Sequence, residues 1–282
     1  MSDTALRPTR SAPATPAFRP PGRARQVRTM VWRNLKHIRR QPEMLADVTI
    51  QPIMFVVLFA FVFGGSIRTP GSGYREWLLP GIMAQTMAFS SFVVAIGLTA
   101  DIDRGIVDRF RSLPISRSSV LVGRSLSSLM HSSIGVVVMS VTGLVIGWRI
   151  REGVVNALLA FGLLLLFGFA MIWVGILVGS TFTSVEAVNG FMFTTMFPIT
   201  FLANTFAPTD NMLPWLRTIA EWNPISSLVQ SLRQLWGNAP EAPASAAWPM
   251  HHPVVVTVVW SIGIALVFAP LALRAFVKRT EG

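Results

Sequence analysis

The sequence predicts an all-α, polytopic membrane protein with six transmembrane helices. Of its 282 residues, 52% are hydrophobic and only 13% are charged, which is unlike an ordinary soluble domain. The apolar residues also gather in long stretches that lack the period-2 alternation of transmembrane barrel strands. A helix needs about 20 mostly apolar residues to cross a bilayer. Six stretches meet or approach this length: 48–65, 78–100, 125–146, 154–178, 188–206 and 254–276.

The distribution of Lys and Arg predicts on which side of the membrane each loop lies. Of the 24 basic residues, 18 lie before Val48, in residues 101–124 or after Leu273, and 6 lie in the alternate loops. By the positive-inside rule, both termini and residues 101–124 are cytoplasmic. The net charge of +11 therefore comes mainly from the Lys and Arg residues of the cytoplasmic segments. Because the arginines form no single basic face, we expect no nucleic-acid partner.

The residues before the first apolar stretch have two different characters. Residues 1–26 contain five prolines and five arginines with no apolar run, which predicts a disordered basic cytoplasmic tail and not a cleaved signal peptide. Residues 27–41 repeat apolar side chains at helical spacing among basic ones, which is typical of an amphipathic helix in the membrane interface. Its contacts are lipid headgroups, a partner protein or both. Residues 42–282 form the six-helix transmembrane domain.

One charged stretch, DRGIVDRFRSLPISR at 103–117, separates two apolar stretches. Asp101 and Arg104 are helix neighbours there, and four apolar residues recur at helical spacing. The four are Ile102, Ile106, Phe110 and Leu113. Pro114 ends this pattern, and Ser116 is suited to cap the next helix. The stretch predicts a short amphipathic helix beneath the membrane, and a solvated loop with positive-inside charge is the alternative.

The last outward segment, residues 208–253, is too long for a simple turn and contains two helical patterns. Residues 214–222 match one short helix. In the second pattern, Asn223 is suited to cap a helix and Pro224 to open it. An apolar stripe follows, made of Ile225, Leu228, Val229, Leu232, Leu235 and Trp236. We expect both helices to lie in or dip into the outer membrane interface, where tryptophan is favoured. The tryptophans concerned are Trp215, Trp222 and Trp236.

The apolar stretches carry almost no ionisable groups. Apart from Arg274 near the end of the last stretch, they contain no Asp, Glu, Lys or Arg, and His131 is their only histidine. Ion-coupled transporters usually need such a group within the membrane. The two lysines, Lys36 and Lys278, belong to no phosphate-binding loop, and the chain has no cysteine. We therefore predict no catalytic, cofactor-binding or metal-binding residues in this chain, and we expect the energy for any transport to come from another subunit.

Three other functions stay open on these residues. A membrane-embedded, lipid-modifying enzyme would use His131 or the adjacent pair His251 and His252. A gradient-driven transporter would respond to protons or sodium, and a passive scaffold would move no cargo. The absence of HExxH and GxSxG patterns disfavours a hydrolase.

Two segments carry a resemblance to a known family. The charged stretch reads G-x-x-x-R-F-R-S-L-P-x-S-R from Gly105, and residues 203–237, ANTFAPTDNMLPWLRTIAEWNPISSLVQSLRQLWG, contain F-x-P-T-D and a later N-P. Both resemble the permease subunits of type-2 ABC exporters, in particular the daunorubicin-resistance, DrrB-like group of actinobacteria. The likeness covers nearly the whole chain after Arg25. The use of 22 arginines against two lysines suits a GC-rich genome, so we expect a protein of the bacterial cytoplasmic membrane.

The resemblance implies a division of labour between subunits that serves drug efflux and antibiotic resistance. Two permease chains, identical or different, would pair, and two separate ATPase subunits holding ATP and Mg would bind on the cytoplasmic side. Residues 102–113 would form the coupling helix that enters a cleft in the ATPase, residues 27–41 the connecting helix, and residues 214–236 a cap around the exit. The residues expected to couple permease and ATPase are Arg104, Gly105, Arg109, Phe110, Arg111, Leu113, Pro114 and Arg117.

The expected cargo path lies between the second and fifth spans of the paired chains. These spans present aromatic and methionine side chains with few hydrogen-bonding groups, which suits a hydrophobic drug, a lipid or a lipid-like metabolite. The candidate path residues are Gln85, Ser90, Phe191, Thr194, Thr195 and Phe197. Helix packing is the alternative role, since Ser and Thr also join helices and GILVG at 175–179 is a small-xxx-small contact motif. Glu186 either touches the ATPase or caps a helix.

Overall fold

The structure is a computed structural model that describes residues 50, 52–64, 69, 73–105, 117–238 and 242–281. Over these residues every regular element is helical, so the predicted all-α class is confirmed. The predicted tail at 1–26 and the amphipathic helix predicted at 27–41 lie outside the described residues.

Five helices of the described chain are long and apolar enough to cross a membrane. They are α3 (Tyr74–Asp103), α5 (Arg117–Ile146), α6 (Gly153–Thr181), α7 (Val185–Leu202) and α11 (Pro253–Glu281). These helices correspond to the second to sixth predicted spans. The first predicted span is described as a shorter apolar helix, Pro52–Val62, that ends in a π-helical segment, η1 (Phe59–Phe63). The chain is therefore a multi-pass membrane protein.

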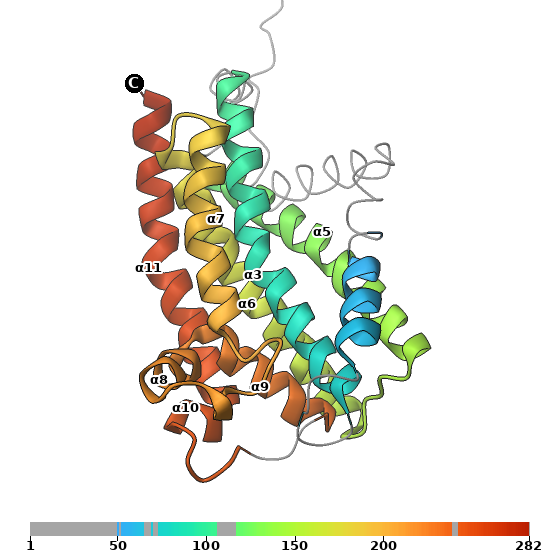
Figure 1. Cartoon of the computed structure of the whole chain (residues 1–282). Helices are drawn as coiled ribbons and strands as arrows, with labels where there is room; N and C mark the ends of the chain where they lie inside the picture. Colours follow the sequence, from blue (N-terminus) through green and yellow to red (C-terminus); the bar gives the residue numbers. More distant parts are fainter. Residues whose placement is uncertain are drawn as a thin grey trace, which may run out of the picture.

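The two ends of the bundle differ (Figure 1). One end, which we call the cap end, carries α8, α9 and α10. The short elements there are η2 (Thr209–Asn211), α8 (Pro214–Trp222), α9 (Pro224–Trp236) and α10 (Trp248–His251). The opposite end, which we call the loop end, holds the last turns of α3 and α11. Both predicted short helices form, and Asn223 Oδ1 caps α9 as predicted by accepting a hydrogen bond from Ile225 N at 2.9 Å.

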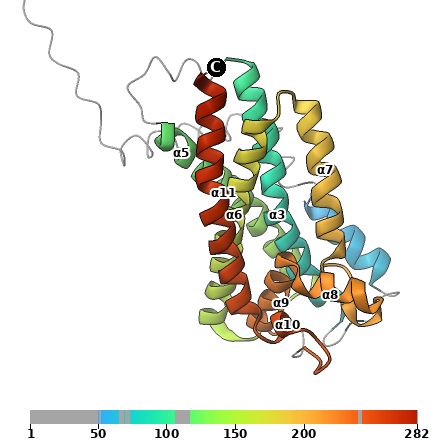
Figure 2. The same cartoon turned by 90° about the vertical axis from the view of Figure 1, so that its left-hand side faces the viewer.

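α6 lies in the middle of the bundle, packed against α3 on one side and α11 on the other (Figure 2). Its contact with α3 depends on glycine. A Cβ at Gly175 would lie 2.2 Å from the carbonyl oxygen of Ser91, and one at Gly179 would lie 2.6 Å from that of Ala95. The two backbones therefore touch, and Thr99 Oγ1 adds a hydrogen bond of 3.0 Å to Gly179 O. The predicted small-xxx-small contact of this helix is confirmed.

α7 is shorter than the predicted fifth span. It ends at Leu202, so Asn204, which was expected inside the span, lies in the linker to η2. The reason is a tertiary contact: Asn204 N donates to Ser226 Oγ of α9 at 3.1 Å. Because α9 takes this amide, the chain leaves the helix before it.

The other end of α7 shows which residue caps the helix next to Glu186, while a contact of Glu186 with the ATPase stays a prediction. Ser184 Oγ caps the helix by accepting a hydrogen bond from Ala187 N at 3.2 Å. Glu186 lies exposed in the first turn, where a carboxylate stabilises the helix dipole. Its contribution to helix α7 is therefore electrostatic, while Ser184 makes the capping hydrogen bond.

Gly175→Ala should destabilise the folded chain by about 1–3 kcal/mol, because the added methyl group would collide with the Ser91 carbonyl and push α6 away from α3. Gly162→Ala is the matched control on the same helix, since nothing lies within 4 Å of a Cβ there. Thermal denaturation of the detergent-solubilised chain measures both variants. Equal denaturation temperatures would contradict a close backbone contact at Gly175.

Candidate functional sites at the two ends of the bundle

The predicted coupling stretch begins where α3 ends. α3 runs through Ile102 to Asp103, and Gly105 follows with φ of 65°, in the left-handed region that favours glycine. Gly105 N donates to Ile102 O at 2.9 Å and so closes the last turn. A separate helix that starts at Ile102 is therefore not observed. Ile102 instead packs against an apolar cluster formed by α3 and its neighbours.

Ion pairs tie the helices together at the loop end. Arg124 of α5 pairs with Asp101 of α3. Arg279 of α11 pairs with Asp103 at 3.3 Å, and its guanidinium also donates to Gly179 O at 3.0 Å. α3, α5, α6 and α11 are thus joined directly beside the coupling stretch. These pairs were not predicted, because Asp101 was expected to pair with its helix neighbour Arg104.

The structure describes only part of the predicted coupling set. Arg104 and Gly105 follow α3 directly, and Arg117 is the first residue of α5. The side chain of Arg117 and the whole of five other residues lie outside the described residues. The five are Arg109, Phe110, Arg111, Leu113 and Pro114. The coupling role of this stretch stays a prediction.

The candidate path residues do not lie together. On α3, Gln85 and Ser90 are buried within the bundle, and Ser90 Oγ donates to Met87 O of its own helix at 2.6 Å. The candidates on α7 are exposed or half-buried: Phe191, Thr194, Thr195 and Phe197. The α3 candidates are therefore enclosed by the bundle, whereas the α7 candidates face outward, and the role of both sets in a cargo path stays a prediction.

α7 has one face packed against the bundle and one aromatic face. Its buried side chains recur every four residues and are Val188, Met192, Met196 and Thr200. Ser91 of α3 donates to Met196 Sδ at 3.8 Å across this contact. The phenylalanines that lie between these positions are consequently directed away from α3.

Six phenylalanines form a continuous ladder from the aromatic face of α7 to the first helix. Successive ring centroids are 4.9, 4.2, 5.1, 5.0 and 4.8 Å apart. In order, the rings belong to Phe193, Phe197, Phe201, Phe206, Phe59 and Phe55. Of the candidate path residues, Phe197 belongs to this ladder, while Phe191 packs against Phe182 at 5.0 Å. The three rings on α7 recur every four residues, whereas the link to Phe59 could not be found from spacing, since Phe59 belongs to a distant segment.

The cap end is organised around Arg233 of α9, whose side chain is fully buried. Its guanidinium lies 3.5 Å from the centre of the Trp77 ring. Nε donates to Trp77 O at 3.0 Å, and Nη2 donates to Asn204 O at 2.9 Å and to Thr205 O at 3.3 Å. Desolvation lowers the pKa of Arg233 well below its ordinary value, which the carbonyl acceptors oppose by stabilising the cation. Arg233 thereby joins α9, the start of α3 and the linker after α7.

A second polar hub surrounds the buried carboxylate of Glu221 in α8. Oε1 accepts hydrogen bonds from Arg217 Nε at 2.6 Å and Thr209 Oγ1 at 3.1 Å, and Oε2 accepts one from Ala247 N at 2.6 Å. Arg217 also pairs with Asp210 at 3.4 Å. The hydrogen bond to Glu221 raises the pKa of Arg217. Thr209 and Asp210, from the F-x-P-T-D segment, thus fasten η2 to α8.

The turn between α5 and α6 is bound to the end of α9. Trp148 and Trp236 are both fully buried, with their rings edge to face at 5.1 Å. Trp148 Nε1 donates to Asn238 Oδ1 at 2.7 Å, and Arg151 N donates to Trp236 O at 3.0 Å. The Arg151 guanidinium makes a bidentate pair with Glu76 of α3, and this hydrogen bonding raises the pKa of Arg151.

Two side chains of the outward segment are buried, although neither was predicted to be. Trp236, which was expected at the outer membrane interface with Trp215 and Trp222, is fully buried against Trp148, whereas Trp215 and Trp222 are exposed. Arg233 was counted among the outward-loop charges and is buried instead. The sequence holds one signal for its burial, since Arg233 follows Val229 by four positions and so falls on the apolar stripe.

The three histidines that a lipid-modifying enzyme would use are His131, His251 and His252, and the last two lie in contact with residues that precede them in the chain. His251 Nε2 lies 3.2 Å from Ala246 O, and the His252 ring packs against Trp248 at 5.0 Å. His131 is half-buried in α5. Within the described ranges, no group of three or more His, Cys, Asp or Glu side chains could hold a metal ion.

Comparison with known proteins places these features in a family. Residues 25–236 match the ABC-2 type transporter family. The daunorubicin resistance ABC transporter permease protein DrrB1 of Streptomyces coeruleorubidus is 27% identical over 248 residues, which cover 88% of this chain and 84% of the relative. A probable doxorubicin resistance ABC transporter permease protein DrrC of Mycobacterium tuberculosis is 26% identical over 227 residues, which cover 79% of this chain and 78% of the relative. A putative transport permease, ycf38, of Porphyra purpurea is 26% identical over 222 residues, which cover 76% of this chain and 74% of the relative.

The chain belongs to the ABC-2 type transporter family. It is similar to the daunorubicin-resistance permeases, which confirms the resemblance predicted from the two segments. The matched residues include the coupling stretch, α3 and the cap helices α8 and α9. The chain is therefore a membrane component of a transporter.

Arg233→Met should lower the free energy of unfolding by about 3 kcal/mol, because three buried carbonyl oxygens lose their donor. The free energy of unfolding of Arg233→Lys should lie between that of Arg233→Met and that of the unmodified chain, because lysine keeps the charge but lacks the planar guanidinium. Arg274→Met removes an exposed arginine of α11 and serves as the control. Thermal denaturation in detergent compares the three. An Arg233→Met variant as stable as the control would exclude Arg233 as the anchor of the cap.

Proposed function

We propose that this chain is the permease of an ATP-driven exporter that moves a hydrophobic or amphiphilic compound out across the cytoplasmic membrane. A second permease chain and separate ATPase subunits, which hold ATP and Mg, complete the transporter. Family membership supports the transport role. Relatives named for daunorubicin and doxorubicin resistance support a drug-like or lipid-like cargo. The permease transmits force and catalyses no reaction itself.

One observation carries the coupling part of the proposal: a single helix, α3, connects the two ends of the bundle. Its 30 residues correspond to about 45 Å of helix. At the loop end, Asp101 and Asp103 hold it to α5 and α11. At the cap end, Glu76 pairs with Arg151, and Trp77 receives the Arg233 guanidinium. A displacement of the stretch after α3 would therefore reach the cap through one continuous helix.

We assign the loop end to the cytoplasm and the cap to the outside. The excess of Lys and Arg in 101–124 and near the C-terminus supports this orientation. An ATPase bound at residues 104–117 would then act directly on the end of α3. The ion pairs made by Arg124 and Arg279 would pass the same movement to α5 and α11.

We assign the cargo surface to the phenylalanine ladder. Its α7 rings are exposed, with Phe193 58%, Phe197 39% and Phe201 43% accessible, so this face is available to a second permease chain and to cargo. Stacked rings offer an apolar, polarisable surface without hydrogen-bonding groups, which suits a hydrophobic compound. Because Gln85 and Ser90 are buried, we place the path along α7 and the first helix, away from the candidates on α3.

Co-purification and reconstitution test this function. The tagged chain, expressed with an ATPase encoded beside it, should retain that ATPase in detergent. Proteoliposomes of the complex should then move a hydrophobic fluorescent drug only when ATP is supplied. Movement that follows a pH or sodium jump without ATP would favour a gradient-driven transporter, and turnover of a lipid analogue by the chain alone would favour an enzyme.

Arg109→Glu and Phe110→Ala should each lower ATP-driven transport by at least about tenfold while the permease still reaches the membrane, because the charged and apolar contacts to the ATPase are lost. Lys278→Glu is the control, since it reverses an exposed charge at the same end of the bundle. The ATPase rate of each complex distinguishes uncoupling from loss of the partner. Full transport by both variants at normal expression would contradict the coupling role.

A further inference from the structure

Arg279, in the last turn of α11, is bonded to two other parts of the chain at the loop end. Its Nη2 donates to Asp103 Oδ1 at 3.3 Å, and its Nη1 donates to Gly179 O at 3.0 Å and to Phe182 O. Asp103 is the last residue of α3, while Gly179 lies in the last turn of α6 and Phe182 in the turn between α6 and α7. One guanidinium therefore joins the end of α3 to the α6–α7 turn.

The surroundings of Arg279 hold its guanidinium in this position. The last carbonyl groups of a helix have no donor within the helix, and a cation beside them is favourable because the helix dipole is negative at that end. Arg279 supplies both to α6, and its side chain is only 17% exposed. One turn earlier, Phe276 is buried in an apolar cluster with Leu98 of α3 and Leu121 of α5. The guanidinium is thus fixed between helices and is not a freely moving surface charge.

The α6–α7 turn is in turn attached to the outward-facing side of α7. The ring of Phe182 packs against that of Phe191, with centroids 5.0 Å apart. Ser184 caps the first turn of α7, and Phe191 is 43% exposed. A chain of contacts therefore runs from Asp103 through Arg279 and Phe182 to an exposed ring of α7.

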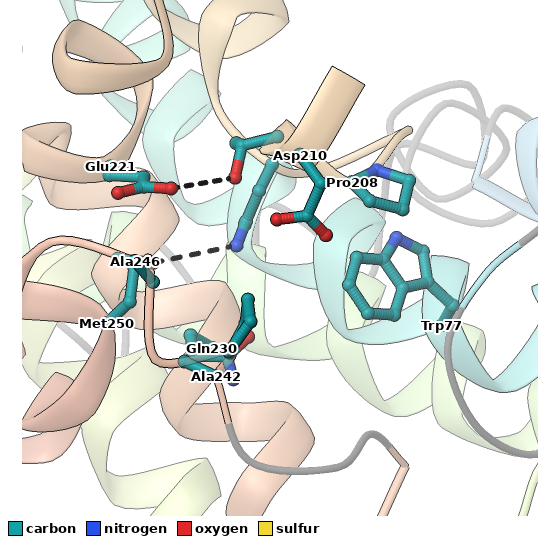
Figure 3. A pocket seen from close by; sticks show the side chains of 11 residues that line it. Trp77, Pro208, Asp210, Glu221, Gln230, Ala242, Ala246 and Met250 are labelled. Atoms are coloured by element: carbon teal, nitrogen blue, oxygen red, sulfur yellow. Dashed lines mark hydrogen bonds between the residues drawn. The ribbon is translucent and has the colours of Figure 1, made fainter. Parts of the chain in front are cut away.

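The other polar contacts near α7 are of a different kind. Within the membrane, Ser91 Oγ of α3 donates to Met196 Sδ at 3.8 Å, and a thioether sulfur is a weak acceptor. At the cap end, Glu221 is bonded by other cap residues beside the cavity that Figure 3 shows. The bonds of Arg279 are charge-assisted and therefore stronger, and they act where the coupling stretch begins.

We infer that Arg279 is a positioning residue that carries the movement of the coupling stretch to α7. The inference rests on the proposed function, in which an ATPase displaces the end of α3. Asp103 then draws the Arg279 guanidinium with it, and the guanidinium draws the two carbonyl groups of the α6–α7 turn. α7 begins directly after this turn, so its exposed rings, which we assign to cargo, move together with α3.

Arg279→Met tests this role in proteoliposomes that contain the permease and its ATPase. It should lower the number of drug molecules moved per ATP hydrolysed by about fivefold or more, while the ATPase rate changes by less than about twofold. Arg279→Lys should give an intermediate ratio, because lysine keeps the charge but lacks the planar guanidinium that reaches both partners. Arg274→Met removes an exposed arginine of the same helix and should leave the ratio unchanged.

Asp103→Asn tests the same link from the other side. It removes the charge pair with α3 and leaves the carbonyl groups of α6 bonded to Arg279. Because Asp103 is 40% exposed, this variant puts little of the fold at risk. It should also lower the ratio of drug moved to ATP hydrolysed. The double variant with Arg279→Met should be no worse than Arg279→Met alone, since both changes break one link.

A label on α7 gives a readout that a purely structural role would not change. The chain has no cysteine, so Ala187→Cys, at an exposed position in the first turn of α7, takes a single environment-sensitive fluorophore. ATP binding to the complex should change the fluorescence of this label. Arg279→Met should abolish the change, and Arg274→Met should retain it.

Equal ratios of drug moved to ATP hydrolysed for Arg279→Met, Asp103→Asn and Arg274→Met would overturn the positioning role. So would a fluorescence change that persists in Arg279→Met, and a lower denaturation temperature with an unchanged ratio would leave Arg279 a structural role only. An unmodified complex that moves no drug with ATP would contradict the exporter proposal, and this inference with it. The two failures are therefore distinguishable.

Discussion

The direct contact between α3 and α6 is the constraint on which the rest of the structure depends. Lipid supplies no hydrophobic force between helices, so van der Waals contact and interhelical hydrogen bonds hold a membrane bundle together. Gly175 and Gly179 let the two backbones touch, and Thr99 adds a hydrogen bond in the same contact. This contact holds the second half of α3 against α6. A helix supported in this way can hold the loop end and the cap end in a set relation to each other.

The polar interactions are placed at the two ends that α3 connects. At the loop end they are ion pairs between side chains of different helices, such as Arg279 with Asp103. At the cap end a buried guanidinium, that of Arg233, uses backbone carbonyls of other segments. Between these ends lies the aromatic face of α7, which continues to the first helix through Phe206 and Phe59. The arrangement fits a permease in which movement enters at one end, cargo passes along an apolar face, and the cap responds.

Local patterns predicted much of the fold because hydropathy, proline and capping act on neighbours in the chain. The five long spans, the bounds of α8 and the Asn223 cap of α9 follow from such patterns. The end of α7 could not be predicted, since it is decided by Ser226 of α9. Of the candidate sites, Phe197 lies on the exposed aromatic face, whereas Gln85 is buried. A helical pattern shows which residues share a face and leaves open what covers that face.

The sequence alone determined that this is a helical membrane protein of the ABC-2 transporter type, because composition sets the cost of leaving water and two short segments carry the family's pattern. Only the tertiary structure decided that Arg233 is buried, that Trp236 belongs to the core, and that the carboxylate of Glu221 is buried. The physical reason is the same for all three. A polar group enters the interior only where a distant segment supplies its partner or leaves a space, and a pattern of neighbouring residues does not contain that information.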